Sequence, residues 1–167
     1  MTQPAQSMSI IIPASNEALH LPGSLAALLA SDPPHLKVEV VVVSNGSQDA
    51  TAEVARGFAG AVAAKGWSLV VLDLAQGGKT NALNAGDRAA TGDLRVYVDA
   101  DIHVSPRLVA GLARALDRPE PAFAGGRPAP MRARSVLSRA YTRLWVRVPF
   151  MTQGVPGCGV YGLNRAG

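Results

Sequence analysis

The chain has 167 residues, of which 48% are hydrophobic and 17% are charged, with a formal net charge of +4 at pH 7. This length and composition fit one well-packed domain and exclude a disordered chain. The mild positive charge suits a phosphate-bearing ligand or an anionic membrane surface and gives no reason to expect nucleic acid. Cys158 is the only cysteine, and no stretch approaches the length of a membrane-spanning helix. We therefore expect a cytoplasmic protein, with peripheral membrane contact left open.

Strand and helix patterns alternate from the N-terminus onward. Apolar runs predict strands at residues 8–12, 38–43, 68–72 and 94–98. The intervening segments predict helices that begin near Ser15 or Asn16 and at residues 49–64, 79–90 and 105–116. This spacing of strand, helix and strand predicts an α/β fold with a mainly parallel sheet and helices on both faces.

The pattern is looser after Arg118. Residues 122–127 and 154–162 favour short strands, and residues 131–148 favour a helix with a basic stripe of Arg139, Arg143 and Arg147. That helix has two interpretations: it lies on an anionic membrane surface, or it packs on the sheet with its arginines in solvent. We favour the second, because core-facing apolar stripes are the commoner case.

Two carboxylates follow the strand at residues 94–98. Because burying unpaired charge is costly, the strand must end where Asp99 and Asp101 begin, at the edge of the sheet. Such a pair suits a divalent cation that holds a phosphate, although aspartates are also common turn residues and helix caps. His103 is a candidate third metal ligand if the strand continues past Asp101, and a loop histidine is the favoured alternative.

The loops after the four strands converge in this fold. Residues 13–17, 44–49, 76–79 and 99–101 all follow parallel strands and therefore share one edge of the sheet. Lys79 follows two glycines and precedes a helix, which suits a phosphate, or else it is an ordinary surface lysine. The segment lacks the spacing of a Walker loop, and no G-x-G-x-x-G follows the first strand.

These loops carry a resemblance to a known family. Residues 9–17 (SIIIPASNE), 41–51 (VVVSNGSQDAT), 78–86 (GKTNALNAG) and the D-x-D of 99–101 resemble, in order and spacing, family 2 glycosyltransferases. Residues 157–165 resemble a segment that lines the acceptor side in that family. The resemblance implies a GT-A fold, which is Rossmann-like and binds nucleotide-diphospho-sugars. It also implies one domain over residues 1–167, with a donor half (8–107) and the start of an acceptor half (108–167), incomplete at the C-terminus.

The resemblance also implies a donor site. Its residues are Pro13, Ala14, Glu17, Asn45, Lys79, Asp99 and Asp101. The first three line the nucleoside end, and Asn45 contacts the base where many members carry aspartate. Lys79 lies near the diphosphate or base, and Asp99 faces the ribose or metal. Asp101 holds Mg²⁺ or Mn²⁺, whereas Asp49 caps the following helix.

The implied reaction moves a sugar from a nucleotide-diphosphate donor to an acceptor, with inversion. Such a transfer needs a carboxylate base, which in this family lies well downstream of the D-x-D. After Asp117 the only acidic residue is Glu120, between two prolines, so no catalytic base is identified. We expect a chain that binds donor and metal but transfers poorly by itself, with a lipid-linked molecule or a polysaccharide as acceptor. The alternative is a nucleotide-sugar-binding module without transfer activity.

Overall fold

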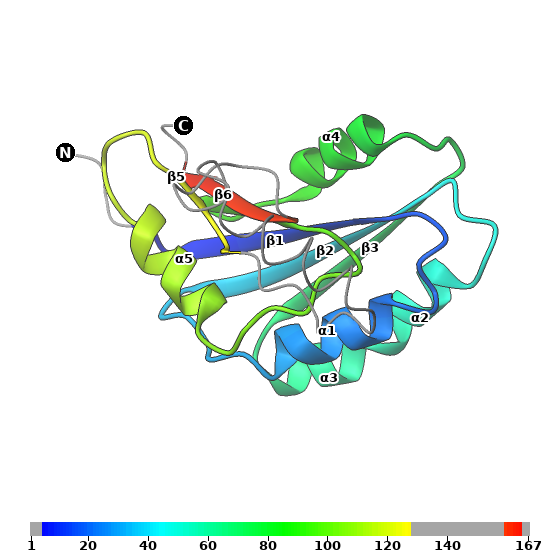
Figure 1. Cartoon of the computed structure of the whole chain (residues 1–167), viewed down its shortest axis with the longest axis horizontal. Coiled ribbons are helices and arrows are strands. Elements are labelled where there is room, and N and C mark those ends of the chain that lie inside the picture. Colours follow the sequence, from blue (N-terminus) through cyan, green and yellow to red (C-terminus); the bar gives the residue numbers. More distant parts are fainter. Residues whose placement is uncertain (1–4, 128–158, 165–167) are drawn as a thin grey trace, which may run out of the picture.

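The structure is a computed structural model that describes residues 5–127 and 159–164. Its centre is a six-stranded sheet with the order β3-β2-β1-β4-β6-β5 (Figure 1). The strands are β1 (Ser7–Ala14), β2 (Lys37–Asn45), β3 (Ser68–Leu74), β4 (Leu94–Val98), β5 (Phe123–Gly125) and β6 (Val160–Asn164). Strands β1 to β4 pair in parallel, whereas β6 is antiparallel to β4 and β5. The predicted mainly parallel α/β sheet is confirmed.

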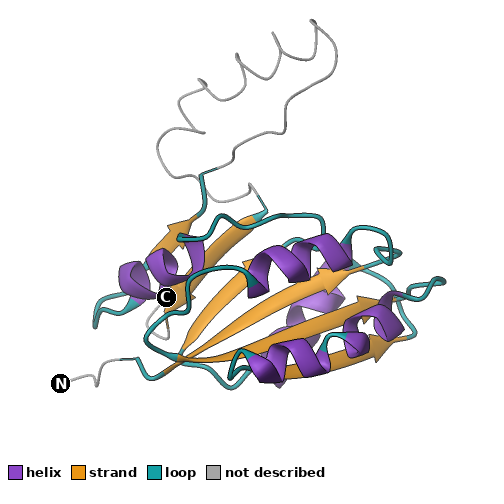
Figure 2. Cartoon of the chain, turned by 90° about the horizontal axis from the view of Figure 1, so that it is seen from below, coloured by secondary structure: helices purple, strands orange, loops and turns teal. Residues whose placement is uncertain are grey.

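Helices cover both faces of the sheet. They are α1 (Leu21–Leu29), α2 (Thr51–Gly57), α3 (Ala59–Ala64), α4 (Lys79–Ala89) and α5 (Leu108–Leu116). Helix α4 packs on one face, against β1 and β2, and the other four helices contribute to the core of the opposite face. Figure 2 looks onto the face that carries α1, α2 and α3.

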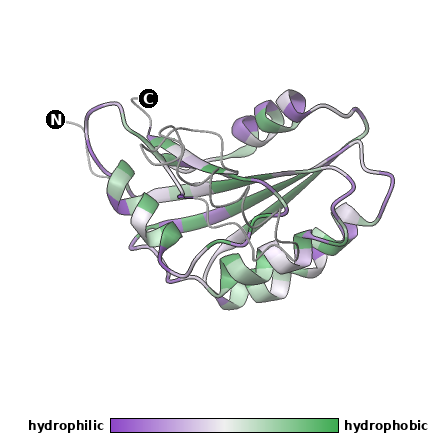
Figure 3. Ribbon diagram, viewed as in Figure 1, coloured by the Kyte–Doolittle hydropathy of each residue, from purple (hydrophilic) through white to green (hydrophobic). Residues whose placement is uncertain are grey.

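Strands β1 and β2, in the interior of the sheet, are apolar on both sides. In β1, Ile10 and Ile12 face the larger core, whereas Ile11 faces α4, and all three are fully buried. The valines of β2 divide in the same way between the two faces, so both strands are apolar almost throughout (Figure 3). Each such side chain stabilises the fold by about 1.5–3 kcal/mol, which makes β1 and β2 a rigid base for the loops that follow them.

Strand β6 comes from the far end of the chain and lies between β4 and β5. The side chain of Asn164, which is 6% exposed, fixes it there. Its amide nitrogen donates to the carbonyl oxygens of Arg118 (2.9 Å) and Glu120 (2.7 Å), and its oxygen accepts from the backbone of Ala122 (3.0 Å). This amide therefore joins the end of β6 to the segment between α5 and β5.

Three helices begin or end at residues other than those predicted from the sequence. The first begins at Leu21, because Asn16 takes a left-handed conformation (φ 55°) and the carbonyl of Glu17 closes a turn before the helix. The helix predicted at 49–64 is two helices that meet at Phe58. The helix predicted from Ser105 begins at Leu108, after a turn.

Some predictions lie outside the described residues: the helix at 131–148 with its arginines, and Cys158. Within residues 5–127 and 159–164, no helix combines the length and apolar character needed to cross a bilayer.

Candidate functional site

A cavity of about 350 Å³ opens where β1, β2 and β4 end. All seven predicted donor-site residues line it: Pro13, Ala14, Glu17, Asn45, Lys79, Asp99 and Asp101. Three more lining residues lie in the loops predicted to converge here but were given no individual role: Ser15, Gly78 and Ala100. Four loops far apart in the sequence thus supply one cavity, as parallel strands that end at the same edge require.

Hydrogen bonds tie the loop after β1 to the loop after β2. Asn16 accepts from the backbone N–H of Gln48 (2.8 Å) through its side-chain oxygen, and its own N–H donates to the Ser47 hydroxyl (3.2 Å). The left-handed conformation of Asn16 allows this pairing, since asparagine adopts it more readily than most residues. The first two loops of the cavity are therefore one connected wall.

Asp49 strengthens the same wall. Its carboxylate accepts from the N–H of Ala18 (3.0 Å) and from both the N–H and the hydroxyl of Thr51. The Thr51 hydroxyl is the main reason why the pKa of Asp49 is lowered from its ordinary value of 3.8. The N–H of Glu17 also donates to the Thr51 hydroxyl oxygen (2.9 Å). Asp49 does hold the start of α2, and it also holds the loop that carries Glu17.

Asn45 brings an amide to the cavity at the end of β2. It is only 4% exposed, and its side-chain oxygen has no hydrogen-bond partner. Gly46 follows with a φ of 61°, and a Cβ there would lie 2.7 Å from the backbone nitrogen of Gly77, so the loop after β3 closes tightly over this point. A buried amide oxygen without a partner is costly, and a bound ligand that donates to it would remove that cost.

An ion pair occupies the opposite end of the cavity. Lys79 is the first residue of α4, and its Nζ donates to Oδ1 of Asp99 at 2.9 Å. The Lys79 side chain is 68% exposed and that of Asp99 39% exposed, so both can be reached from solvent. Among the ion pairs of the described chain, none includes Asp101. One cation and two carboxylates thus meet where a helix begins.

His103 does not join the two aspartates. Strand β4 ends at Val98 and a turn follows, so the strand alternation that would align His103 with Asp101 is lost. The ring of His103 instead lies against Gly23 of α1, where a Cβ would be 2.8 Å from its Nε2. In the part of the chain that the structure describes, no three His, Cys, Asp or Glu side chains cluster as a metal site. The idea of a histidine as third ligand is therefore abandoned.

Strand β6 reaches this end of the cavity. The N–H of Asp99 donates to the carbonyl of Gly159 at 2.8 Å, and the position of a Cβ on Gly159 would be 3.6 Å from Oδ2 of Asp99. Tyr161 follows two residues later and stacks on Tyr97 of β4. Sequence reasoning placed this segment on the acceptor side by resemblance but did not identify Tyr161 as a neighbour of Asp99.

Residues 9–156 match the family model for glycosyl transferase family 2. This match covers most of the chain, so the chain belongs to glycosyltransferase family 2.

Similar proteins include the glycosyltransferase AglE of Haloferax volcanii, which is 37% identical over 101 residues, covering 60% of this chain and 32% of the relative. The dolichyl-phosphate beta-glucosyltransferase of Drosophila melanogaster is 38% identical over 105 residues, with coverages of 59% and 32%. A mannosyltransferase from Pyrobaculum calidifontis, solved with GDP-Man and Mn²⁺, superposes with a TM-score of 0.69 and 25% identity over 98% of this chain and 46% of that one. This likeness confirms the GT-A fold. The chain spans about a third of the length of the curated relatives it matches.

Proposed function

We propose that this chain binds a nucleoside-diphosphate sugar with a divalent cation and serves the transfer of that sugar to an acceptor. The observation that carries the proposal is the distribution of polar and charged side chains along this cavity. A buried amide, Asn45, lies at one end, and Lys79, Asp99 and Asp101 lie at the other. A base needs hydrogen-bond partners in a dry setting, whereas a diphosphate needs charges, so the two ends suit the two ends of a nucleotide.

The acidic residues fit a hard cation. Mg²⁺ and Mn²⁺ prefer oxygen ligands, and Mg²⁺ is commonly held by one or two carboxylates together with substrate phosphates. Asp99 and Asp101 supply such a pair without a histidine. When bound, the cation would neutralise the negative charge that develops on the departing nucleoside diphosphate.

Lys79 and the start of α4 supply the remaining positive potential. The first N–H groups of a helix have no partner within it, and the helix dipole places partial positive charge there. Helix α4 begins at Lys79, directly after Gly78, whose φ of 128° requires glycine. The diphosphate would therefore lie against the helix N-terminus with the Lys79 ammonium beside it.

The transfer step also needs a base for the acceptor. Three carboxylates line the cavity, and two are paired: Glu17 with His20 at 2.9 Å and Asp99 with Lys79. Asp101, the third, is assigned to the cation, which leaves none for inversion. Donor binding with weak transfer by the 167-residue chain is thus the expected behaviour, and a donor-binding module without transfer is the second candidate. The acceptor class favoured here is a lipid-linked phosphate, by analogy with the dolichyl-phosphate enzyme.

Calorimetry with UDP and GDP, each with and without Mn²⁺, tests donor binding. We expect Mn²⁺ to strengthen binding of at least one nucleotide at least tenfold, and Asp101→Asn to abolish that gain. The control is Asp32→Asn, on an exposed loop remote from the cavity, which should retain it. If the wild-type chain binds neither nucleotide, or if Asp101→Asn keeps the full Mn²⁺ effect, the proposal is wrong. A transfer assay with UDP-glucose and a polyprenyl phosphate then separates the two candidates, because only an enzyme turns over.

A further inference from the structure

Three aromatic rings form a row across the side of the sheet that contains β6. They are Tyr97 of β4, Tyr161 of β6 and Phe123 of β5, on three neighbouring strands. The ring centroids of Tyr97 and Tyr161 are 4.8 Å apart with an angle of 19° between planes, and those of Phe123 and Tyr161 are 6.0 Å apart at 16°. Tyr161 is therefore held between two rings, which restricts its rotation and fixes the direction of its hydroxyl.

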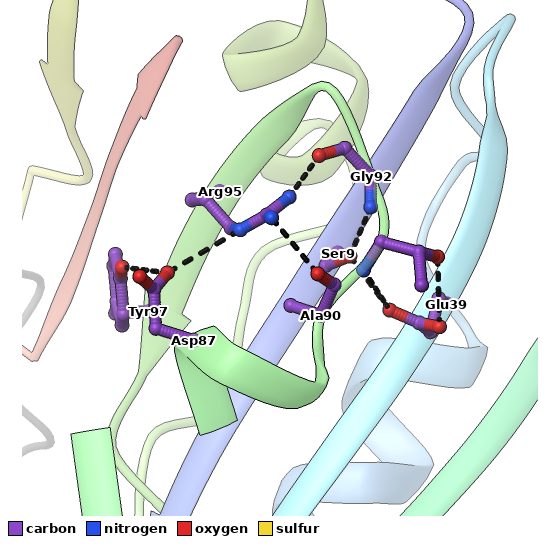
Figure 4. A network of polar contacts seen from close by, with 8 residues as sticks. Ser9, Glu39, Asp87, Ala90, Gly92, Arg95 and Tyr97 are labelled. Carbon is purple, nitrogen blue, oxygen red and sulfur yellow. Dashed lines mark hydrogen bonds and ion pairs between the residues drawn. The ribbon is translucent and has the colours of Figure 1, made fainter. Parts of the chain in front are cut away.

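The two tyrosine hydroxyls differ in one respect. The Tyr97 hydroxyl donates to Oδ1 of Asp87 at 2.9 Å, and Asp87 is itself paired with Nε of Arg95 at 3.3 Å (Figure 4). Arg95 in turn donates to the carbonyls of Ala90 and Gly92. The Tyr161 hydroxyl makes no hydrogen bond to any other residue in the described ranges. The network thus immobilises Tyr97 and leaves Tyr161 as the hydroxyl available to a ligand.

Tyr161 lies near Lys79 and Asp99, two residues that line the cavity. Burial is the main cause that raises the pKa of its hydroxyl, and the charges of Lys79 and Asp99 act on the same pKa in opposite directions. The hydroxyl is therefore within the field of both charges and stays protonated at neutral pH. The bond from the N–H of Asp99 to the carbonyl of Gly159 fixes the start of β6 against this end of β4.

The order of the strands predicts what lies beside Tyr161. Across the sheet the cavity receives Asn45 from β2, then Pro13 and Ala14 from β1, then Asp99 from β4, and β6 is the next strand. A nucleotide with its base at Asn45 and its diphosphate at Asp99 has its sugar one step further on. That step reaches β6, where the free hydroxyl is.

We propose that Tyr161 binds the glycosyl group of the donor, with its phenolic hydroxyl hydrogen-bonded to a sugar hydroxyl and its ring fixed by Tyr97 and Phe123. This inference rests on the proposed function, because it takes the nucleotide to lie across the sheet from Asn45 to Asp99. In this proposal Tyr161 contacts only the sugar, so a change at Tyr161 should alter the affinity for a nucleotide-sugar but not for the bare nucleoside diphosphate.

The test compares nucleotide-sugars with the matching nucleoside diphosphates. Dissociation constants are measured by calorimetry in Mn²⁺ for UDP, UDP-glucose, UDP-GlcNAc, GDP and GDP-mannose, using the full chain. Tyr161→Phe removes one oxygen and keeps the stack, and we expect it to weaken the best nucleotide-sugar about fivefold while the bare diphosphate is unchanged. Tyr97→Phe is the matched control: its hydroxyl is bound to Asp87, so it should lower the melting temperature and leave the ratio of the two constants unchanged.

The outcomes distinguish the two proposals. If the wild-type chain binds none of the five compounds, the proposed function falls, and this inference falls with it. If nucleotides bind but Tyr161→Phe changes sugar and bare diphosphate equally, or changes neither, only the role of Tyr161 is overturned. The same holds if Tyr97→Phe reproduces the selective loss, because the effect then comes from the stack and not from the free hydroxyl.

Discussion

Lys79 has two possible partners, and removing it should change the affinity of two ligands in opposite directions. In the structure its ammonium is 2.9 Å from Asp99, a carboxylate that we assign to the cation. A cation bound there must compete with Lys79, whereas a diphosphate would attract Lys79 away. We predict that Lys79→Met strengthens binding of Mn²⁺ to the nucleotide-free chain and weakens binding of the nucleoside diphosphate.

The magnitudes follow from exposure and charge. The pair is 68% and 39% exposed, and pairs of that kind contribute about 0.2–1 kcal/mol, so Mn²⁺ should bind up to about fivefold more tightly without Lys79. A charge-assisted hydrogen bond to phosphate contributes about 1.5–3 kcal/mol, so the nucleotide should bind about 10 to 100 times more weakly. Misfolding would weaken both, so opposite signs cannot come from general damage to the site.

Electron paramagnetic resonance of free Mn²⁺ gives the first constant, and calorimetry with UDP or GDP in saturating Mn²⁺ gives the second. Lys79→Arg is the control, since it retains the charge at the same position and should change the Mn²⁺ constant little. If Lys79→Met leaves Mn²⁺ affinity unchanged or lowers it, Lys79 does not compete for Asp99, and the assignment of Asp99 to the cation is wrong.

Three further substitutions test the surroundings of the site. Asn45→Asp should shift the relative affinity from UDP toward GDP by about 1–3 kcal/mol. The reason is that a carboxylate accepts hydrogen bonds from the two donors of guanine but cannot donate one to uracil. An equal loss of affinity for both nucleotides would refute contact between Asn45 and the base. Asp49→Ala should weaken nucleotide binding by loosening the loop wall. In the wild type the pKa of Asp49 is lowered, so its hydrogen bonds are intact above its ordinary value of 3.8 and are lost as pH falls through the lower folded value. Nucleotide affinity measured at decreasing pH should therefore decline in the wild type more than in Asp49→Ala. Gly86→Ala places a Cβ 2.5 Å from Cγ2 of Ile11 and should lower the free energy of unfolding, measured by urea titration, by about 1–3 kcal/mol. In an Ile11→Ala background, which removes the clash, Gly86→Ala should lower it by less.

The residues of the cavity could be predicted from the sequence because each follows a strand that the sequence marks clearly. The apolar runs around Ile11 and Val41 allow only buried parallel strands, and parallel strands fix which loops share an edge. Asp99 and Asp101 mark the end of β4 by their charge alone. These inferences are local: they need a strand, its end and its direction.

Other features depend on distant contacts and were missed for that reason. Nothing near Asp49 in the sequence indicates that it binds the N–H of Ala18, and nothing near Tyr161 indicates that it stacks on Tyr97. The choice between the two interpretations of His103 depended on whether the strand continued, and the turn after Val98 supports the favoured one, a histidine outside the strand. Helix boundaries failed at Phe58, where two short helices replace the single one that the pattern predicted.

The position of Lys79 is set from the far end of its helix. Glu39 of β2 accepts from the N–H (3.0 Å) and hydroxyl (3.1 Å) of Thr91, and the N–H of Gly92 donates to the Ser9 hydroxyl at 2.8 Å (Figure 4). These bonds fasten the turn after α4 to β1 and β2.

Gly86 adds a second attachment, because its lack of a Cβ lets α4 approach Ile11 closely. Helix α4 is thus attached both at its C-terminal end and along its length. Because the helix backbone is rigid over its 11 residues, these attachments also fix the position of its first residue, Lys79. Gly78, just before the helix, is the conformationally free residue, so the loop that precedes Lys79 can adjust to a diphosphate while the helix stays in place. We therefore expect the polar network on the sheet face to influence the proposed donor binding without contacting the donor.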